Sequence, residues 1–389
     1  MCANVDGGTL TEYPEVRATT LRNVRRIVIK LGSSLVTTTG EGLNAPLMAS
    51  LVQQISELMD QGLEILLVSS GAVAAGTQKL QLKEIPRTVS LKQAAAAVGQ
   101  SYLIWAYEKL FDQYHHQVAQ VLLTHADLGN RRRYLNARNT LITLLQHRVI
   151  PIINENDTVS VSEIKFGDND TLSALVTNLV EADLLIILTD TDGLYTQDPR
   201  IHPQAELITL VPSITPDIER LGGGKGTAMG TGGMYTKIQA AKKVVISGIP
   251  VLIANGRCEK VLHRLLAGED LGTLFLPYKT PLLRGRKHWI VHTLKPRGII
   301  TVDDGAREAI LYKGKSLLPS GIVAVEGNFE FGDAVTCCDL NGKAFARGLV
   351  NYNAKEVRRI KQHHTSHIES LLGYKYQDEV IHRDNLVLL

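Results

Sequence analysis

The sequence has little cysteine, few aromatic residues and almost no excess of charge. Its 389 residues include four cysteines, none with the CxxC or Cys/His spacing of a zinc site. This usage indicates a reduced, cytoplasmic setting and no cysteine-bound metal. The formal net charge of +3 does not by itself indicate a nucleic-acid or membrane partner. Apolar runs such as 184–188 are far shorter than the roughly 20 residues of a membrane span.

What the sequence does have is the composition of a globular protein, with 44% hydrophobic and 21% charged residues. The length exceeds that of one ordinary core, so two domains are expected. After about residue 256 the chain becomes rich in proline and basic residues, and short apolar runs then alternate with glycine and aspartate. We predict a flexible tail over 1–24, a first domain over 25–275, a linker over 276–296, a small second domain over 297–375 and a C-terminal tail over 376–389.

The first domain alternates strand-like and helix-like segments. Apolar runs at 184–188 and elsewhere lack polar alternation, which is typical of strands buried on both faces of a parallel sheet. Segments with helical spacing, such as 171–180, separate them. The pattern predicts an α/β fold, a three-layer αβα sandwich with a mainly parallel central sheet, followed by a small β-rich domain. In such folds, ligands bind at the carboxyl ends of the strands.

Two of the predicted strand ends carry glycine and small polar residues. Lys30 and Gly32 follow the first strand, where a lysine and exposed backbone N–H groups can meet an anion. On its own, this segment is better explained as a solvated lysine beside a tight turn. The segment 69–76, which begins with Ser69 and Ser70, suits a substrate carboxylate or phosphate, and it equally suits close packing of a helix on a strand.

Acidic and amide residues crowd the next connection, at 154–157 and 167–170. Asp170 or Thr171 could serve as a helix N-cap, but capping needs only one of them. A small amino acid with an ammonium group needs carboxylate or amide oxygens, and this connection supplies them. We therefore favour a binding role for it.

A glycine-dense segment at 222–237 leads into a helix whose first turn carries Lys237. It lacks the GxxxxGK[ST] spacing of a P-loop, but exposed amides and a lysine make a plausible phosphate cradle. The alternative is a surface loop. Segment 189–195 follows the buried strand, and its position favours a nucleotide contact, although Asp-Gly pairs are usually only turns.

In combination, these segments resemble the amino acid kinase family. The resemblance rests on IVIKLGSS (27–34), LLVSSGAVAAG (66–76), INENDTVS (153–160), FGDNDTLSALV (166–176), LTDTDGLY (188–195) and GTGGMYTKIQAA (230–241). The segments GIITVDDGA (298–306) and ARGLVNY (346–352) resemble a PUA domain, a small β-rich barrel.

The resemblance implies a kinase that uses ATP to phosphorylate the γ-carboxylate of glutamate, the first step of proline biosynthesis. It assigns the organisation of catalysis to Asp170, and our hypothesis is that Lys30 and Lys237 flank the transferring phosphoryl group as the other catalytic residues. It assigns substrate binding to Ser70, Asp157, Asn169 and Asp168. It assigns ATP binding to Lys30, Thr189, Asp190, Thr231, Gly232, Gly233, Met234, Tyr235, Thr236 and Lys237.

The resemblance also implies Mg²⁺ carried by the ATP phosphates rather than by protein ligands. It further implies feedback inhibition by proline, a homo-oligomer (dimer or tetramer) and a possible handover of product to glutamyl phosphate reductase. Two alternatives stay open. A related kinase could act on aspartate or N-acetylglutamate, or the PUA domain could bind RNA, although the charge and the lack of an aromatic platform argue against RNA.

Overall fold

The computed structural model describes residues 13–38, 42–84, 86–159, 168–223, 233–278 and 295–389, which form two compact units. Each unit has its own sheet and is described by itself. In the described part of the chain, no helix is both long enough and apolar enough to cross a membrane.

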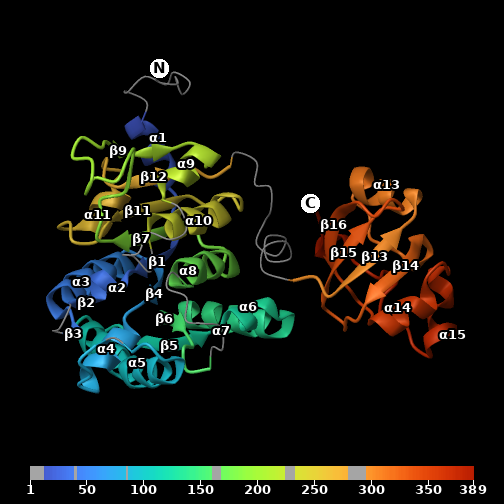
Figure 1. Ribbon diagram of the computed structural model, residues 1–389, viewed down its shortest axis with the longest axis horizontal. Helices are drawn as coiled ribbons and strands as arrows, with labels where there is room; N and C mark the ends of the chain where they lie inside the picture. The colour runs from blue at the N-terminus through green and yellow to red at the C-terminus, as the bar shows by residue number, and fades with distance from the viewer. Residues whose placement is uncertain (1–12, 39–41, 85, 160–167, 224–232, 279–294) are drawn as a thin grey trace. The chain divides into compact units, whose positions relative to one another are not determined.

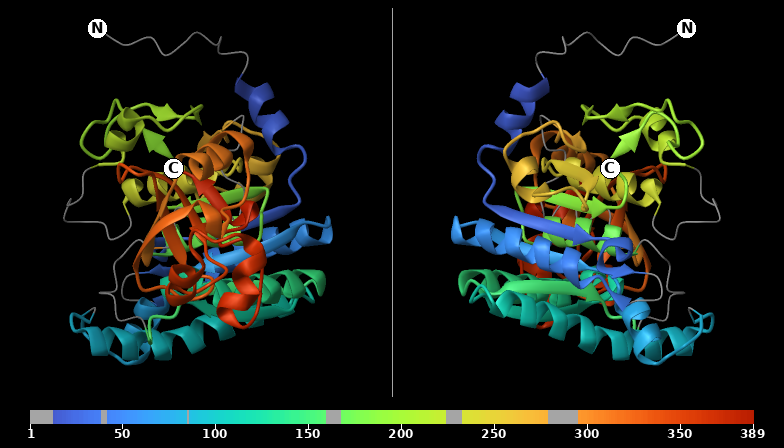
Figure 2. Two further views of the ribbon diagram at one scale, coloured as in Figure 1. Left: turned by 90° about the vertical axis from the view of Figure 1, so that its right-hand side faces the viewer. Right: turned by 90° about the vertical axis from the view of Figure 1, so that its left-hand side faces the viewer.

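The larger unit is built on a mainly parallel sheet of eight described strands (Figures 1 and 2). The strand order is β10-β12-β11-β7-β1-β4-β6-β5, and within it the β11–β12 pair is antiparallel. The central strands are buried on both faces, which explains their unbroken apolar sequences. The bounds are β1 Arg26–Leu31, β4 Glu64–Ser69, β5 Val118–Leu123, β6 Ile150–Glu155, β7 Leu184–Thr189, β10 Leu210–Val211, β11 Val251–Asn255 and β12 Thr273–Phe275.

Helices cover both faces of this sheet, which confirms the predicted three-layer fold (Figure 1). The side chains of Ile27 and Ile29 in β1 pack toward α3 (Ala45–Asp60), α5 (Val89–Asp112) and α11 (Val261–Leu266). On the other face lie α8 (Asp168–Leu179) and α10 (Met234–Val245). Shorter or more peripheral elements are α2 Ser33–Val36, α4 Ala72–Lys79, α6 His125–Gly129, α7 Arg131–Gln146, α9 Pro216–Leu221, β2 Thr37–Thr38, β3 Gly42–Leu43, β8 Leu194–Tyr195 and β9 Leu207–Ile208.

The small residues after β4 form helix α4, which packs tightly on α5. A Cβ added to Gly76 would lie 1.7 Å from the carbonyl oxygen of Ala95, and one added to Gly99 would lie 1.8 Å from that of Ala72. Only glycine permits this approach of the two backbones. The packing interpretation of this segment therefore holds for its helical part, whereas Ser70, just before it, faces the site described below.

The N-terminal segment is more ordered than predicted. Helix α1 (Tyr13–Leu21) places Arg17 in a buried position, where its guanidinium donates to the carbonyl oxygens of Thr209, Glu269, Leu271 and Gly272 at 2.7–2.9 Å. Burial lowers the pKa of Arg17, and Asp270 at 3.4 Å opposes that shift. The prediction of a flexible tail over 1–24 is thus wrong for residues 13–21, because Arg17 satisfies the carbonyl groups of two distant loops.

The smaller unit is β-rich, as predicted, with the described strand order β14-β13-β15-β16-β17. The predicted C-terminal tail belongs to it, because β17 pairs with β16 and Ile381 bridges Leu317. Val380, Ile381 and Leu386 are buried in its core, which corrects the prediction of a tail over 376–389. The bounds are β13 Gly298–Val302, α13 Asp304–Lys313, β14 Ile322–Gly327, β15 Ala334–Cys338, β16 Ala344–Leu349, α14 Ala354–Ile360, α15 Ile368–Leu372 and β17 Leu386–Leu388.

Candidate active site

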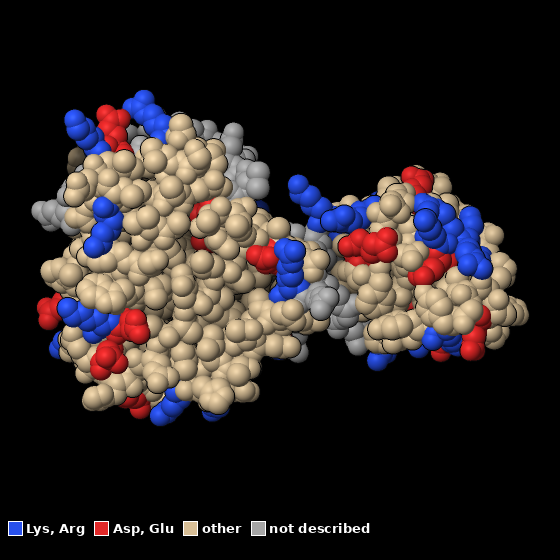
Figure 3. Space-filling model, turned by 90° about the horizontal axis from the view of Figure 1, so that it is seen from below, with Lys and Arg blue, Asp and Glu red and all other residues tan. Residues whose placement is uncertain are grey.

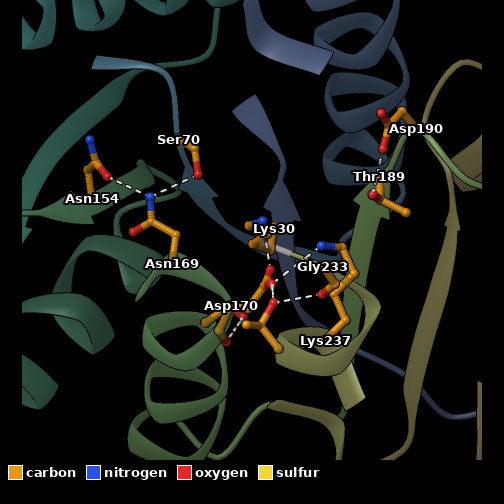
Figure 4. A network of polar contacts seen from close by, with 11 residues as sticks. Lys30, Ser70, Asn154, Asn169, Asp170, Thr189, Asp190, Gly233 and Lys237 are labelled. Carbon is orange, nitrogen blue, oxygen red and sulfur yellow. Dashed lines mark hydrogen bonds and ion pairs between the residues drawn. The ribbon is translucent and has the colours of Figure 1, made fainter. Parts of the chain in front are cut away.

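The carboxyl ends of neighbouring strands gather most of the predicted site residues. Lys30 lies near the end of β1, Ser70 directly follows β4, and Thr189 ends β7. These strands are adjacent in the sheet, since β1 pairs with both β4 and β7. Asn169 and Asp170 come from the first turn of α8, and four predicted ATP-binding residues, 234–237, come from the first turn of α10. Figure 4 shows how the labelled side chains converge.

The centre of the site is a buried carboxylate held between two lysines. Asp170 Oδ1 lies 2.7 Å from Lys30 Nζ, and Asp170 Oδ2 lies 3.4 Å from Lys237 Nζ. Asp170 has no exposed surface, and both lysines are almost fully buried. Within this group of three residues two positive charges face one negative charge, and the carboxylate of Asp190, which follows β7, also acts on Lys237 (Figure 4). Such a centre attracts anions strongly, because buried charges are poorly screened.

Thr236 completes the support of this carboxylate. Its hydroxyl lies 2.6 Å from Asp170 Oδ2 and 2.8 Å from the carbonyl oxygen of Gly233. The hydroxyl has one proton to donate, and the charged carboxylate of Asp170 is a stronger acceptor than the carbonyl oxygen of Gly233. Gly233 is the N-cap residue of α10 and offers no side-chain acceptor to the first backbone N–H groups. The start of α10 can therefore donate to an anion.

Electrostatics fix the charge states of this centre. Burial by itself raises the pKa of Asp170, but the attraction of Lys30 and Lys237 outweighs it and the pKa lies below its usual value. Asp170 is therefore ionised at neutral pH. Burial lowers the pKa of Lys237, with Asp170 opposing the shift.

The lowered pKa of Lys237 predicts an alkaline loss of activity. As pH rises through that pKa, Lys237 loses its proton and with it its attraction for an anion bound at the strand ends. For the ATP that the sequence resemblance implies, we expect kcat/KM to fall with a midpoint below about 10.4, the usual lysine pKa. A pH–rate profile of the wild type and of Lys237→Arg checks this, because a guanidinium keeps its charge. Identical alkaline limbs in both proteins would contradict the assignment.

A chain of polar side chains lies on the β4 and β6 side of the site. Asn169 Nδ2 donates to Ser70 Oγ and to Asn154 Oδ1, both at 2.9 Å. Asn154 Nδ2 in turn donates to Gln100 Oε1 at 2.8 Å. Asn169 Oδ1 is buried without a hydrogen-bond partner among the residues that the structure describes. A buried acceptor of this kind lacks a hydrogen bond that a donor brought beside it would supply.

The remaining predicted residues fall into three groups. Thr189 and Asp190 lie together, with Thr189 Oγ1 3.2 Å from Asp190 Oδ1. Asp157 follows β6, is partly buried and has an interaction partner. Asp168 begins α8, but its side chain lies outside the described part of the structure, as do the predicted ATP-binding residues Thr231 and Gly232.

Sequence reasoning missed Gln100. The residue lies on the buried face of the alanine-rich helix α5, one position after Gly99. A glutamine on a buried helix face needs hydrogen-bond partners, and that is the signal that could have found it. Among the described residues, no group of three His, Cys, Asp or Glu side chains could hold a metal ion.

Known proteins are similar to this chain over most of its length. A model of the amino acid kinase family matches residues 25–255, and a model of the PUA domain matches residues 298–372. A glutamate 5-kinase from Geobacter sulfurreducens is 56% identical over 374 residues, which cover 96% of this chain and 100% of that relative. Another, from Caldanaerobacter subterraneus subsp. tengcongensis, is 55% identical over 94% of this chain and 98% of the relative.

Proposed function

Because the chain belongs to the amino acid kinase family and, within it, to the glutamate 5-kinases, we propose that Lys30, Asp170 and Lys237 carry its phosphoryl transfer. The reaction moves the γ-phosphoryl group of ATP to the γ-carboxylate of L-glutamate. Its products are L-glutamyl 5-phosphate and ADP, and it opens proline biosynthesis. The observation that supports the proposed roles is the net positive centre of the three residues at the strand ends.

The chemistry explains why charge matters more here than proton transfer. A γ-carboxyl group with a pKa of about 4.3 is already ionised at neutral pH, so it attacks phosphorus without a general base. The obstacle is repulsion between two anions, roughly 4 kcal/mol for unit charges about 4 Å apart at an effective dielectric of about 20. Lys30 and Lys237 offset this repulsion and hold the transferring group in line.

Asp170 has a positioning role in this scheme. It is fully buried and bound by two lysines and a threonine, so it is not the nucleophile or a base. Its negative charge holds the two lysine ammonium groups close together. Without it, their mutual repulsion would drive them apart. The lysines are thereby set in place before ATP arrives, and little reorganisation is needed during transfer.

The residues of this site fit a Mg²⁺ ion that is bound by the phosphates of ATP and not by a protein carboxylate. The central carboxylate is already engaged by two lysines, so it makes a poor metal ligand. Mg²⁺ prefers phosphate and water oxygens in a near-octahedral shell, which the nucleotide supplies. When bound there, the ion neutralises charge on the phosphates.

The residues proposed to bind the phosphoryl acceptor favour glutamate over N-acetylglutamate. Asn169 Oδ1 can accept a hydrogen bond from an α-ammonium group, and the carboxylate of Asp157 can pair with the same charge. N-acetylglutamate has no ammonium group to meet these oxygens. We assign Ser70 to the same subsite because its hydroxyl binds Asn169.

The function is tested by trapping its product. The purified protein is incubated with ATP, Mg²⁺, hydroxylamine and one of glutamate, aspartate or N-acetylglutamate, and hydroxamate is measured. We expect hydroxamate with glutamate at a rate that exceeds the rate with N-acetylglutamate by at least about tenfold, the effect of one lost charge-assisted hydrogen bond. The rate with aspartate should also be lower, because its side chain is one methylene shorter and its carboxylate does not reach the same position. Equal or faster reaction with either alternative acid would overturn the assignment of the acceptor.

We also propose that the enzyme forms a homo-oligomer through α5. Leu91, Val98 and Trp105 recur every seven residues on this helix and are at least 40% exposed, with Trp105 at 53%. They share one face, here called the apolar stripe. Strand β5 at the neighbouring sheet edge also leaves one side unpaired among the described strands. The face of the larger unit that carries α4 and α5 shows few charged side chains (Figure 3).

Trp105→Glu should therefore dissociate the oligomer. A charge buried without a partner in a subunit interface is strongly disfavoured. Light scattering should give a multiple of the chain mass for the wild type and for Tyr312→Glu, which changes an aromatic residue 80% exposed on α13. Trp105→Glu should give the mass of one chain. An unchanged mass would exclude the stripe as the interface.

A further inference from the structure

One contact fixes the orientation of the hydrogen-bonded side-chain amides of Gln100, Asn154 and Asn169. A carboxamide can turn by 180° and exchange its oxygen and nitrogen, so hydrogen bonds between amides alone fit either orientation. Asn154 Oδ1, however, accepts from the backbone N–H of Glu155 at 2.9 Å. A backbone N–H only donates, so the atom beside it must be the oxygen of Asn154.

The orientation then passes to both neighbours. The nitrogen of Asn154 must face Gln100, whose Oε1 accepts from it at 2.8 Å. The oxygen of Asn154 must accept from Asn169, whose Nδ2 uses its two hydrogens on Asn154 and on Ser70. The oxygen of Asn169 is left over, buried and unpartnered within the described residues. Asn154, oriented by the backbone N–H of Glu155, thus sets which atom of Asn169 is presented to a ligand, and Gln100 holds the carboxamide of Asn154 in place from α5.

We propose that Gln100 and Asn154 are positioning residues that lock the carboxamide of Asn169 with its oxygen toward the α-ammonium group of the acceptor. The enzyme thereby selects a free amino acid over an N-acylated one. The inference rests on the proposed function. If the amide of Asn169 could turn, its NH₂ would face the ammonium and repel it, while it could donate to the carbonyl oxygen of an acyl group.

Two substitutions of Gln100 separate this role from packing. Gln100→Met removes the acceptor for Asn154 and keeps the volume. Gln100→Glu keeps an oxygen that can accept from Asn154. The replaced nitrogen, Nε2, has no hydrogen-bond partner among the described residues, so no hydrogen bond is lost with it. Gln113→Met, at an exposed position after the end of α5, is the matched control.

We expect Gln100→Met to raise KM for glutamate by about three- to tenfold, the effect of one hydrogen bond, with kcat and KM for ATP little changed. Its preference for glutamate over N-acetylglutamate, as a ratio of kcat/KM values, should fall by a similar factor. Gln100→Glu should restore both values, and Gln113→Met should match the wild type. Thermal unfolding shows whether each variant is folded.

An unchanged KM and an unchanged preference in folded Gln100→Met would overturn this inference while wild-type conversion of glutamate still stood. Absence of glutamate conversion by the wild type would instead overturn the proposed function. If Gln100→Met does not fold, a wild-type crystal with glutamate decides. The ammonium nitrogen should lie about 2.7–3.2 Å from the Asn169 carboxamide oxygen. A substrate carboxylate at that atom would exclude the proposed orientation.

Discussion

Lys237→Met is expected to lower kcat by about a hundred- to a thousandfold, the usual effect of removing one charged donor from a transferring group. The dissociation constant of ATP should change much less, because Lys30, the start of α10 and the proposed nucleotide contacts of Thr189 and Asp190 remain. The expectation follows from the position of Lys237 Nζ, which is buried beside Asp170 at the strand ends. Rapid-quench kinetics and an equilibrium titration with nucleotide measure the two quantities separately.

Lys242→Met provides the control for this prediction. Lys242 lies on the same helix, but it is partly exposed and paired with Glu219, away from the buried carboxylate. Its loss should leave kcat close to the wild-type value, since exposed ion pairs contribute little. If kcat were equally unaffected in Lys237→Met, the lysine would have no part in the transfer.

Asp170→Asn should reduce both stability and activity. The substitution leaves two buried lysines without their shared counter-charge, and breaking a buried ion pair in this way costs roughly 3–5 kcal/mol. Urea unfolding should show that loss. The product-trapping assay should show kcat lower by at least about a hundredfold, because the lysines are no longer held together.

A triple variant distinguishes the two effects. Replacing the whole cluster, Lys30→Met with Asp170→Leu and Lys237→Met, removes the unpaired charges and should recover most of the lost stability. Activity should remain absent. Wild-type stability in Asp170→Asn, or activity in the triple variant, would show that the cluster is not the electrostatic centre that we infer.

The fold was readable from the sequence because its strands are buried on both faces. Leu184–Thr189 is apolar apart from Thr189, and strands of this kind indicate a parallel sheet with helices on either side. The structure of the two terminal segments could not be predicted from the sequence. Arg17 makes its hydrogen bonds to residues about two hundred positions away or more, and β17 has only three residues. Neither leaves a periodic pattern in its own segment, so tertiary contacts alone order them.

The site was predictable where motifs mark it and unpredictable where packing makes it. Lys30, Asp170 and Lys237 stand beside glycines or at the starts of helices, so the residue types of their segments are enough to suggest anion binding. Gln100 follows a run of alanines and lies one position after Gly99, where α5 approaches α4 too closely for a Cβ. That approach depends on two segments at once, and no local sequence pattern reports it. The roles assigned to the site residues stay predictions until the variants are measured.

The central claim is that Lys30 and Lys237 gather positive charge around the transferring phosphoryl group. A crystal structure with glutamate, ADP and a metal fluoride in place of that group tests it most directly. Our account predicts both Nζ atoms about 2.7–2.9 Å from fluorine or phosphate oxygen atoms, as in charge-assisted hydrogen bonds. Both lysines directed at Asp170 alone, with a water layer between them and the fluoride, would contradict it.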